Sequence, residues 1–200
     1  MGDFTKDYQP QGWNPALARM SFFKKPITNK RPEGQPVTLF QVWQYVRGRW
    51  AMPETAALRA LTDKEEQRAY KNLHFDYVTP SGVFAYCNDA SLIQHSELMC
   101  MDLDELGDVE TLKARLLADP LFETLLLFRS PRGNGLKWWI AIDLSKCDHK
   151  TWFTAVRNYL MFTYQLSETQ VDKSCSNVSK ACYLCHDPEA YLKTELIEYF

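Results

Sequence analysis

Leu98–Asp104, with the sequence LMCMDLD, is the clearest β-strand in this chain. Four apolar residues lead into two aspartates that are separated by Leu103. Because strand side chains alternate between the two faces of a sheet, Asp102 and Asp104 project from one face, and Met101 and Leu103 from the other. The stretch therefore predicts a strand that ends in a pair of carboxylates on one face.

Two more strands follow in the second half of the chain. Thr124–Arg129 and Leu136–Ile142 are apolar and are joined by the short loop Ser130–Gly135, which predicts an antiparallel pair. Asp108 and Asp148 are typical N-cap residues, and the apolar periodicity after each predicts a helix. Strands and helices interleave without the regular count of a doubly wound sheet. The sequence therefore predicts an α+β fold with helices packed on one face of an antiparallel-rich sheet.

The remaining segments show weaker patterns. Residues 1–20 predict an irregular leader, and residues 21–200 predict a single domain. The further elements that we expect are a short strand after Ser21 followed by a basic loop, helices over Thr38–Trp50 and Pro53–Leu73, a strand at Phe75–Val78, a hairpin-like bend at Thr79–Gly82, a short helix after Ser91, and extended segments at Ala181–Leu184 and Glu195–Phe200.

The composition is that of a globular protein. The chain has 200 residues, of which 46% are hydrophobic and 24% are charged, and this excludes a disordered chain or a coiled coil. Its longest apolar run, Trp138–Ile142, is far shorter than the roughly 20 residues of a membrane-spanning helix. The N-terminus shows no signal-peptide pattern. We therefore expect a cytoplasmic protein without membrane contact, in which the six cysteines are free thiols.

Charge is distributed unevenly along the chain. The net charge is -2, but residues 1–50 carry +5 and residues 51–130 carry -7. A basic N-terminal part therefore precedes an acidic middle.

The spacing of Asp102 and Asp104 suits a divalent cation. Two carboxylates on one face repel each other unless a cation lies between them, and hard cations prefer oxygen ligands. Replacing both by asparagine should then abolish divalent-metal binding and either stabilise the metal-free fold or barely change it. The alternative is a strand that runs out into solvent, where acidic residues are common.

The loop from Ser130 to Lys137 has the composition of a phosphate-binding loop. Gly133 and Gly135 allow backbone N–H groups to approach an anion, and Ser130, Arg132 and Lys137 add donors and positive charge. The alternative is an ordinary hairpin turn that needs glycine for its backbone geometry. The glycine spacing matches neither a Walker loop nor a dinucleotide-binding fingerprint.

Three further features carry less information. Asp172 follows an apolar residue and adds a third acid to the pair and the loop. The sequence CYLCH at residues 182–186 resembles a haem attachment site or half of a zinc site, with Cys175 or His149 as further ligands, but we favour a strand whose Cys182 faces the core. Trp138 and Trp139 are adjacent, so one should face outward, where it could stack on a base.

The order of carboxylate pair, glycine loop and third acid resembles the archaeo-eukaryotic primase, or primase-polymerase, superfamily. The closer resemblance is to the VirE N-terminal domain family of Bacteroidetes mobile elements, a primase-like group. It rests on Ser21–Thr28, Phe75–Val78, His95-Ser96 with Leu98–Asp104, Ser130–Trp138, and Ser179–Cys182 leading to His186-Asp187-Pro188. This resemblance implies an RRM-like catalytic sheet of primase-polymerase type.

The resemblance assigns roles to particular residues. It makes Asp102, Asp104 and Asp172 the catalytic acids that hold Mg²⁺ or Mn²⁺. The residues that it assigns to the nucleotide are Ser130, Arg132, Gly133, Gly135, Lys137 and Lys180. Active relatives have histidine at the position of Lys137 and usually arginine at that of Lys180, and lysine reproduces neither imidazole chemistry nor bidentate arginine geometry.

The leading hypothesis is a primase or polymerase that acts in replication of a mobile element. Its partners would be nucleoside triphosphates and a single-stranded DNA template. The phosphates of this template would be contacted by the basic residues Lys24, Lys25, Lys30 and Arg31. A helicase domain in the same protein or operon is left open. The alternatives are a nucleotide-binding or nucleic-acid-binding module of the same fold without transfer chemistry, and a nuclease that uses the same acids.

Overall fold

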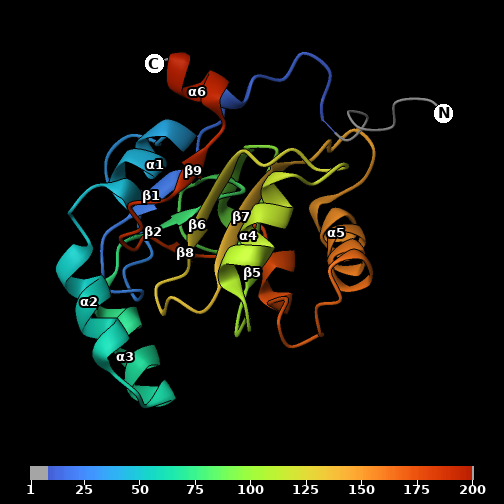
Figure 1. Cartoon of the computed structure of the whole chain (residues 1–200). Helices are drawn as coiled ribbons and strands as arrows, with labels where there is room; N and C mark the ends of the chain where they lie inside the picture. The colour runs from blue at the N-terminus through green and yellow to red at the C-terminus, as the bar shows by residue number, and fades with distance from the viewer. Residues whose placement is uncertain (1–8, 200) are drawn as a thin grey trace.

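The computed structural model describes residues 9–199 (Figure 1). Its elements are, in chain order, the 3₁₀ helix η2 (Pro15–Leu17), β1 (Ser21–Phe23), α1 (Leu39–Arg47), α2 (Met52–Ala60), α3 (Lys64–His74), β2 (Tyr77–Thr79), β3 (Gly82–Phe84), η3 (Asp89–Ser91), β4 (Leu92–His95), β5 (Leu98–Leu103), α4 (Val109–Leu117), β6 (Leu126–Arg129), β7 (Leu136–Ala141), α5 (His149–Thr163), η4 (Lys173–Ser176), β8 (Cys182–Tyr183), β9 (Tyr191–Leu192) and α6 (Thr194–Glu198).

The central sheet has four strands in the order β5-β7-β6-β9, and every neighbouring pair is antiparallel. An isolated antiparallel bridge between Leu103 and Val171 lies at the outer side of β5. Along the chain, β5, α4, β6, β7, α5 and this bridge follow the β-α-β-β-α-β order of ferredoxin-like folds. The α+β class and the predicted antiparallel pair of β6 and β7 are thus confirmed.

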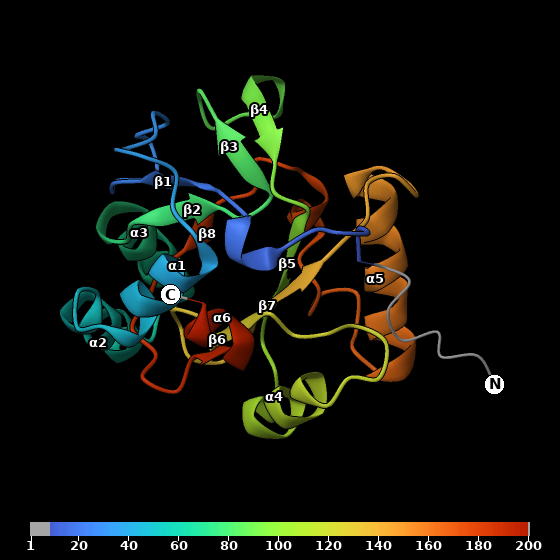
Figure 2. The same ribbon diagram turned by 90° about the horizontal axis from the view of Figure 1, so that it is seen from above.

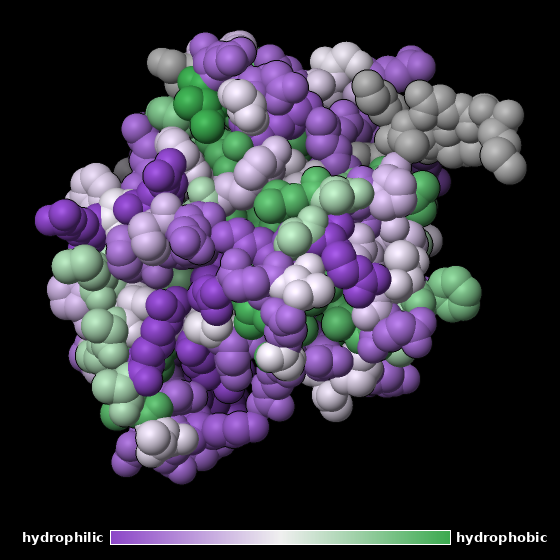
Figure 3. Space-filling model, in the orientation of Figure 1, coloured by the Kyte–Doolittle hydropathy of each residue, from purple (hydrophilic) through white to green (hydrophobic). Residues whose placement is uncertain are grey.

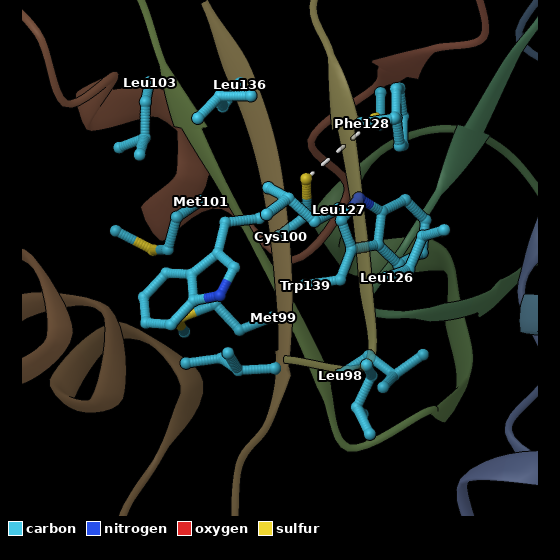
Figure 4. Close-up of a cluster of buried hydrophobic side chains, with 14 of the residues drawn as sticks. Leu98, Met99, Cys100, Met101, Leu103, Leu126, Leu127, Phe128, Leu136 and Trp139 are labelled. Carbon is cyan, nitrogen blue, oxygen red and sulfur yellow. Dashed lines mark hydrogen bonds between the residues drawn. The ribbon is translucent and has the colours of Figure 1, made fainter. Parts of the chain in front are cut away.

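Both faces of this sheet are covered. Figure 2 shows α4 and α5 on one side, and α1 with the small sheet β1-β2-β8 on the other. In Figure 4, Met99 and Met101 lie on one side of β5, whereas Trp139 and Leu126 lie on the other, and all four are buried. The expectation that helices cover one face is correct, but a second sheet together with α1 covers the opposite face.

Because both faces of the central sheet are covered, two adjacent tryptophans on β7 can both be buried. Trp138 and Trp139 are both fully buried. Trp138 points toward the α4 and α5 side, where its indole N–H donates to Thr124 Oγ1 at 2.8 Å, and Trp139 lies in the layer between the sheets with Phe128. The prediction that one of them faces outward is wrong, because each face of the sheet has its own core.

The helix starts follow the predicted capping residues. Thr38 forms a capping box with Gln41, and the carboxylates of Asp108 and Asp148 accept hydrogen bonds from the third residue of their helices. These contacts satisfy backbone N–H groups that have no partner inside the helix. The helices α1, α4 and α5 are thereby confirmed, and α5 ends at Thr163.

Four local predictions differ from the structure. The segment after Ser91 is strand β4, which pairs with β3, so the bend at residues 79–82 joins two different sheets and forms no hairpin. The predicted helix over residues 53–73 is divided into α2 and α3. Thr194–Glu198 is the short helix α6, which buries Leu196, whereas Phe200 lies outside the described residues. These segments are short, and distant packing partners decide their structure.

The N-terminal part contributes to the core as far as the structure describes it. Residues 1–8 of the expected leader lie outside the described residues, but Ala16, Ala18 and Met20 are buried in the main core cluster. None of the helices in residues 9–199 combines the length and the apolar character that crossing a bilayer requires.

Candidate functional site

Three carboxylates meet at the end of β5. Asp102 is the fifth residue of β5, Asp104 follows the strand, and Asp172 caps η4, 68 residues after Asp104. One oxygen from each side chain lies within 4.8 Å of the others, and Asp102 is the most buried of the three. The predicted convergence of these acids is therefore confirmed. Within residues 9–199 this is the one grouping of three or more potential metal-ligating side chains.

Backbone hydrogen bonds hold the two acidic segments together. Asp172 N–H donates to the carbonyl of Asp102 at 3.0 Å, and Asp104 N–H donates to the carbonyl of Gln170 at 2.9 Å. Between these bonds lies the bridge of Leu103 with Val171. The third acid is thus positioned by main-chain contacts with the strand that carries the other two.

Lys137 forms a buried ion pair with Asp102. The two residues are directly opposite in the register of β7 and β5, and the Lys137 ammonium contacts Asp102 Oδ2. Burial acts to lower the pKa of Lys137, but the adjacent Asp102 carboxylate raises this pKa well above its usual value. Lys137 is therefore charged, and its charge is already directed at a carboxylate.

The other two acids also have cationic partners. Arg132 lies 3.4 Å from Asp104 Oδ1, and Lys180 lies 2.5 Å from Asp172 Oδ2. Burial acts to raise the pKa of Asp172, but Lys180 and hydrogen bonds from Ser174 lower it to about 2. In the structure each of the three carboxylates is therefore bridged by a cation, and the premise of two unbridged, repelling carboxylates is wrong.

The Ser130–Gly135 loop packs tightly against the end of β5. Gly133 has a φ of 86°, and a Cβ on Gly135 would lie 2.3 Å from the carbonyl oxygen of Leu103, so both positions need glycine. The N–H of Gly133 donates to Ser130 O at 2.9 Å, as in a turn. Ser130 Oγ is buried and has no hydrogen-bond partner in the part of the chain that the structure describes.

Helix α3 adds cations that the sequence analysis missed. Lys71 lies near Lys137 and Arg132, and its ammonium is 5.0 Å from the centre of the Tyr183 ring. Burial and then the Lys137 charge lower the pKa of Lys71 to about 8. The sequence contains a pattern that could have identified them, because Lys64, Arg68 and Lys71 are spaced so that they lie on one face of a helix.

A basic pocket lies between α3 and the loop. It has a volume of about 250 Å³ and is lined by Lys64, Glu65, Gln67, Arg68, Lys71 and Arg132. Four of these side chains are cationic and one is acidic. Figure 3 shows hydrophilic side chains gathered over the end of the molecule where α3 lies in Figure 1.

The basic segment after β1 is largely engaged within the molecule. Lys24 pairs with the buried Asp76 at 3.0 Å, and Lys25 pairs with Glu54 at 2.8 Å. Lys30 lies over the Tyr77 ring, and Arg31 is exposed. No carboxylate of residues 9–199 forms an ion pair with Lys30 or Arg31, so these two cations remain available for another anion.

The cysteine-rich end forms core and no metal site in the described residues. Cys182 is buried on β8, which confirms its predicted orientation, and its sulfur lies 3.9 Å from that of Cys100. His149 does not join a cysteine cluster, because its ring contacts the backbone carbonyl of Cys175 at 3.1 Å. The zinc interpretation of this segment therefore has no support in residues 9–199.

Two histidines connect β4, α5 and η4. The N–H of Glu97 donates to His95 Nδ1 at 2.9 Å, so the other ring nitrogen of neutral His95 carries the hydrogen and donates to His149 Nδ1 at 3.2 Å. His149 in turn donates to Cys175 O on η4. Burial and then His149 lower the pKa of His95 to about 4, and burial lowers that of His149. The fold therefore holds both rings neutral.

We expect this pair to make stability depend on pH. The unfolded chain takes up protons at the ordinary histidine pKa of about 6.5, whereas folded His95 stays neutral down to about 4. Stability should therefore fall as the pH is lowered from 6.5, by about 1.4 kcal/mol per pH unit for each extra proton bound by the unfolded state. Urea unfolding from pH 5 to 6.5, where carboxylates contribute little, should show a flatter dependence for the double variant His95→Gln, His149→Gln. If the free energy of unfolding of the double variant depended on pH as steeply as that of the wild type, the assignment of this pH dependence to the histidine pair would be wrong.

The comparison with known proteins assigns the chain to a family. The family model described as BT4734-like, N-terminal domain, matches residues 69–192. The chain belongs to this BT4734-like family. The match contains all three acids, the glycine loop, Lys137, Lys180 and also Lys71, but it begins after residues 24–31. No curated protein and no solved structure matches the chain.

Proposed function

We propose that this BT4734-like domain is a nucleotidyltransferase of primase or polymerase type that acts in replication of a mobile genetic element. The observation that carries the proposal is the convergence of Asp102, Asp104 and Asp172 within 4.8 Å. Such a constellation suits two divalent ions, which in nucleotidyl-transfer sites lie about 3.5–4 Å apart.

The donor set fits Mg²⁺ or Mn²⁺. All three side chains offer carboxylate oxygens, the ligands that hard cations prefer. Asp102 Oδ1 is buried and has no hydrogen-bond partner among the described residues, so one coordination position is free of competition. A buried acceptor without a partner costs free energy, and a cation at this position would remove that cost.

The residues around the acids have defined tasks in this proposal. When bound, the metal ions would activate the attacking hydroxyl and stabilise charge on the leaving pyrophosphate. Asp102, Asp104 and Asp172 would hold them. Arg132, at the rim of the basic pocket, would orient the triphosphate. Lys137 would remain paired with Asp102 and compensate the negative charge of the buried end of the site.

Two more observations support the class of activity. The β-α-β-β-α-β order around β5 is compatible with the RRM-like sheet that the VirE and primase resemblance implies. Lys30 and Arg31 lack ion-pair partners in residues 9–199 and would contact the single-stranded template, as would Lys24 and Lys25 if their pairs open. A helicase domain in the same protein or operon would supply this template by unwinding duplex DNA.

A binding module without transfer chemistry is the second candidate. It is favoured by the ion pairs of Lys137, Arg132 and Lys180, which balance the three carboxylates without any metal. In that case nucleotide or nucleic acid would bind to the basic pocket, and the acids would serve only to hold the cations.

A primer-synthesis assay on single-stranded DNA with Mn²⁺ and either ribonucleotides or deoxynucleotides separates the candidates. We expect synthesis by the wild type, and loss of synthesis and of calorimetric Mn²⁺ binding in Asp104→Asn and Asp172→Asn. Asp108→Asn is the matched control, because it removes an exposed carboxylate and asparagine still caps α4. Nucleotide binding without synthesis by the wild type would favour the module, and full Mn²⁺ affinity in Asp104→Asn would refute the site.

A further inference from the structure

The cations next to the acidic triad fall into two groups. Lys137 and Lys180 contact carboxylates directly, and Arg132 lies at a longer distance from Asp104. Lys71 and Arg68 of α3 form no ion pair and no side-chain hydrogen bond with another described residue. Lys64 of α3 pairs with Glu105 at 2.6 Å, so the cations of this pocket that are free to meet a ligand are Arg68 and Lys71.

Lys71 is the most informative of these residues. Its ammonium packs over Tyr183 and is largely removed from water, next to the like charges of Lys137 and Arg132. Placing a desolvated cation beside other cations is unfavourable unless an anion joins them. Lys137 and Arg132 are already paired with Asp102 and Asp104, whereas Lys71 has no ion-pair partner among residues 9–199, so an anion in the pocket would give Lys71 its counter-charge.

The shape and lining of the pocket restrict the anion. Its volume of about 250 Å³ is below the range of about 300–1,000 Å³ of pockets that enclose a whole drug-sized ligand. Its lining has four cations and no aromatic or aliphatic residue that would hold a base. Lys64, Arg68 and Lys71 lie on one face of α3, and Arg132 of the Ser130–Gly135 loop lines the same pocket, so positive charge borders the pocket on two sides.

We propose that the pocket between α3 and the Ser130–Gly135 loop binds the terminal phosphates of a nucleoside triphosphate, with Lys71 and Arg68 on one wall and Arg132 on the other. This inference rests on the proposed function for the direction of the ligand, since the α-phosphate would lie at the acids. The triphosphate tail then extends away from Lys137 toward α3, because Arg132 contacts both Asp104 and the pocket.

The test measures calorimetric binding of inorganic tripolyphosphate, with and without Mn²⁺, and of thymidine monophosphate. We expect Lys71→Gln to weaken tripolyphosphate binding by about tenfold or more, and Lys71→Gln with Arg68→Gln by about a hundredfold, because each removes a charge-assisted hydrogen bond. Monophosphate binding should not change. Lys71→Arg should retain affinity, and Lys150→Gln, which removes an exposed cation on α5, is the matched control.

Three results would overturn the inference. These are absence of tripolyphosphate binding by the wild type, unchanged binding in the α3 double variant, and a loss that affects only a single-stranded oligonucleotide and its salt dependence. If Lys71→Gln melts much earlier than the wild type, Arg68→Gln, at an exposed position, decides the question alone. Failure of the proposed function would appear separately, as a wild type that does not bind Mn²⁺ but still binds tripolyphosphate through α3.

Discussion

Lys137→Met is expected to lower the free energy of unfolding by about 3–5 kcal/mol in the presence of a chelator. Lys137 and Asp102 are both buried, with 4% and 6% of their surface exposed, and they face each other across β7 and β5. Removing the ammonium leaves a buried carboxylate without its ion-pair partner. Urea unfolding measures the effect, and Lys150→Met on the exposed side of α5 should change stability by less than about 0.5 kcal/mol.

Two additional measurements make this prediction specific. A double variant, Lys137→Met with Asp102→Leu, should recover most of the loss, because it removes both charges together. Mn²⁺ should raise the melting temperature of Lys137→Met more than that of the wild type, since a cation then replaces the missing ammonium. A loss below about 1 kcal/mol in Lys137→Met would show that the pair does not neutralise Asp102.

Trp139→Ala is expected to lower the free energy of unfolding by about 3–5 kcal/mol, the usual cost of truncating a buried aromatic residue. The Trp139 side chain fills the layer between the central sheet and the β1-β2-β8 sheet, beside Phe128. Trp50→Ala is the control, because 69% of Trp50 is exposed and its loss leaves no cavity. Chemical unfolding measures both variants.

Trp139→Ala also tests whether Trp139 stacks on a nucleic-acid base, a role that its burial excludes. Since Trp139 is not exposed, its replacement should leave the affinity for single-stranded DNA unchanged under conditions where the variant is folded. A selective loss of DNA affinity, with little loss of stability, would mean that the indole is accessible and that the packing described for this layer is incorrect.

Local sequence patterns predicted the elements that carry the acids. The apolar run Leu98–Met101 identified β5, and the alternation of strand side chains placed Asp102 and Asp104 on one face. Asp108 and Asp148 marked the starts of α4 and α5. These features depend on interactions between residues near each other in the chain, so a single sequence contains them. The convergence of Asp172 was predicted from the order of the motifs, through a family resemblance.

The charge network could not be predicted in the same way. The pairing of Lys137 with Asp102 depends on the register between β5 and β7, and one residue of slip would turn the lysine to the other face. Lys71 reaches the site only because α3 packs near the loop, which no local pattern specifies. The burial of Trp138 and Trp139 requires knowledge of what covers each face of the sheet, and alternation along a strand identifies the faces but not their neighbours.

The main-chain bonds between Asp102, Asp104, Gln170 and Asp172 have a consequence for ligand entry. The backbone that carries all three acids is already fixed by these bonds and by the Leu103–Val171 bridge. A cation that arrives there would therefore reorganise only side chains, and the entropy of ordering a loop would not be subtracted from its affinity. The backbone of the three acids is therefore preorganised for a cation. The amide hydrogens of Asp104 and Asp172 should exchange slowly with solvent even before any ion binds.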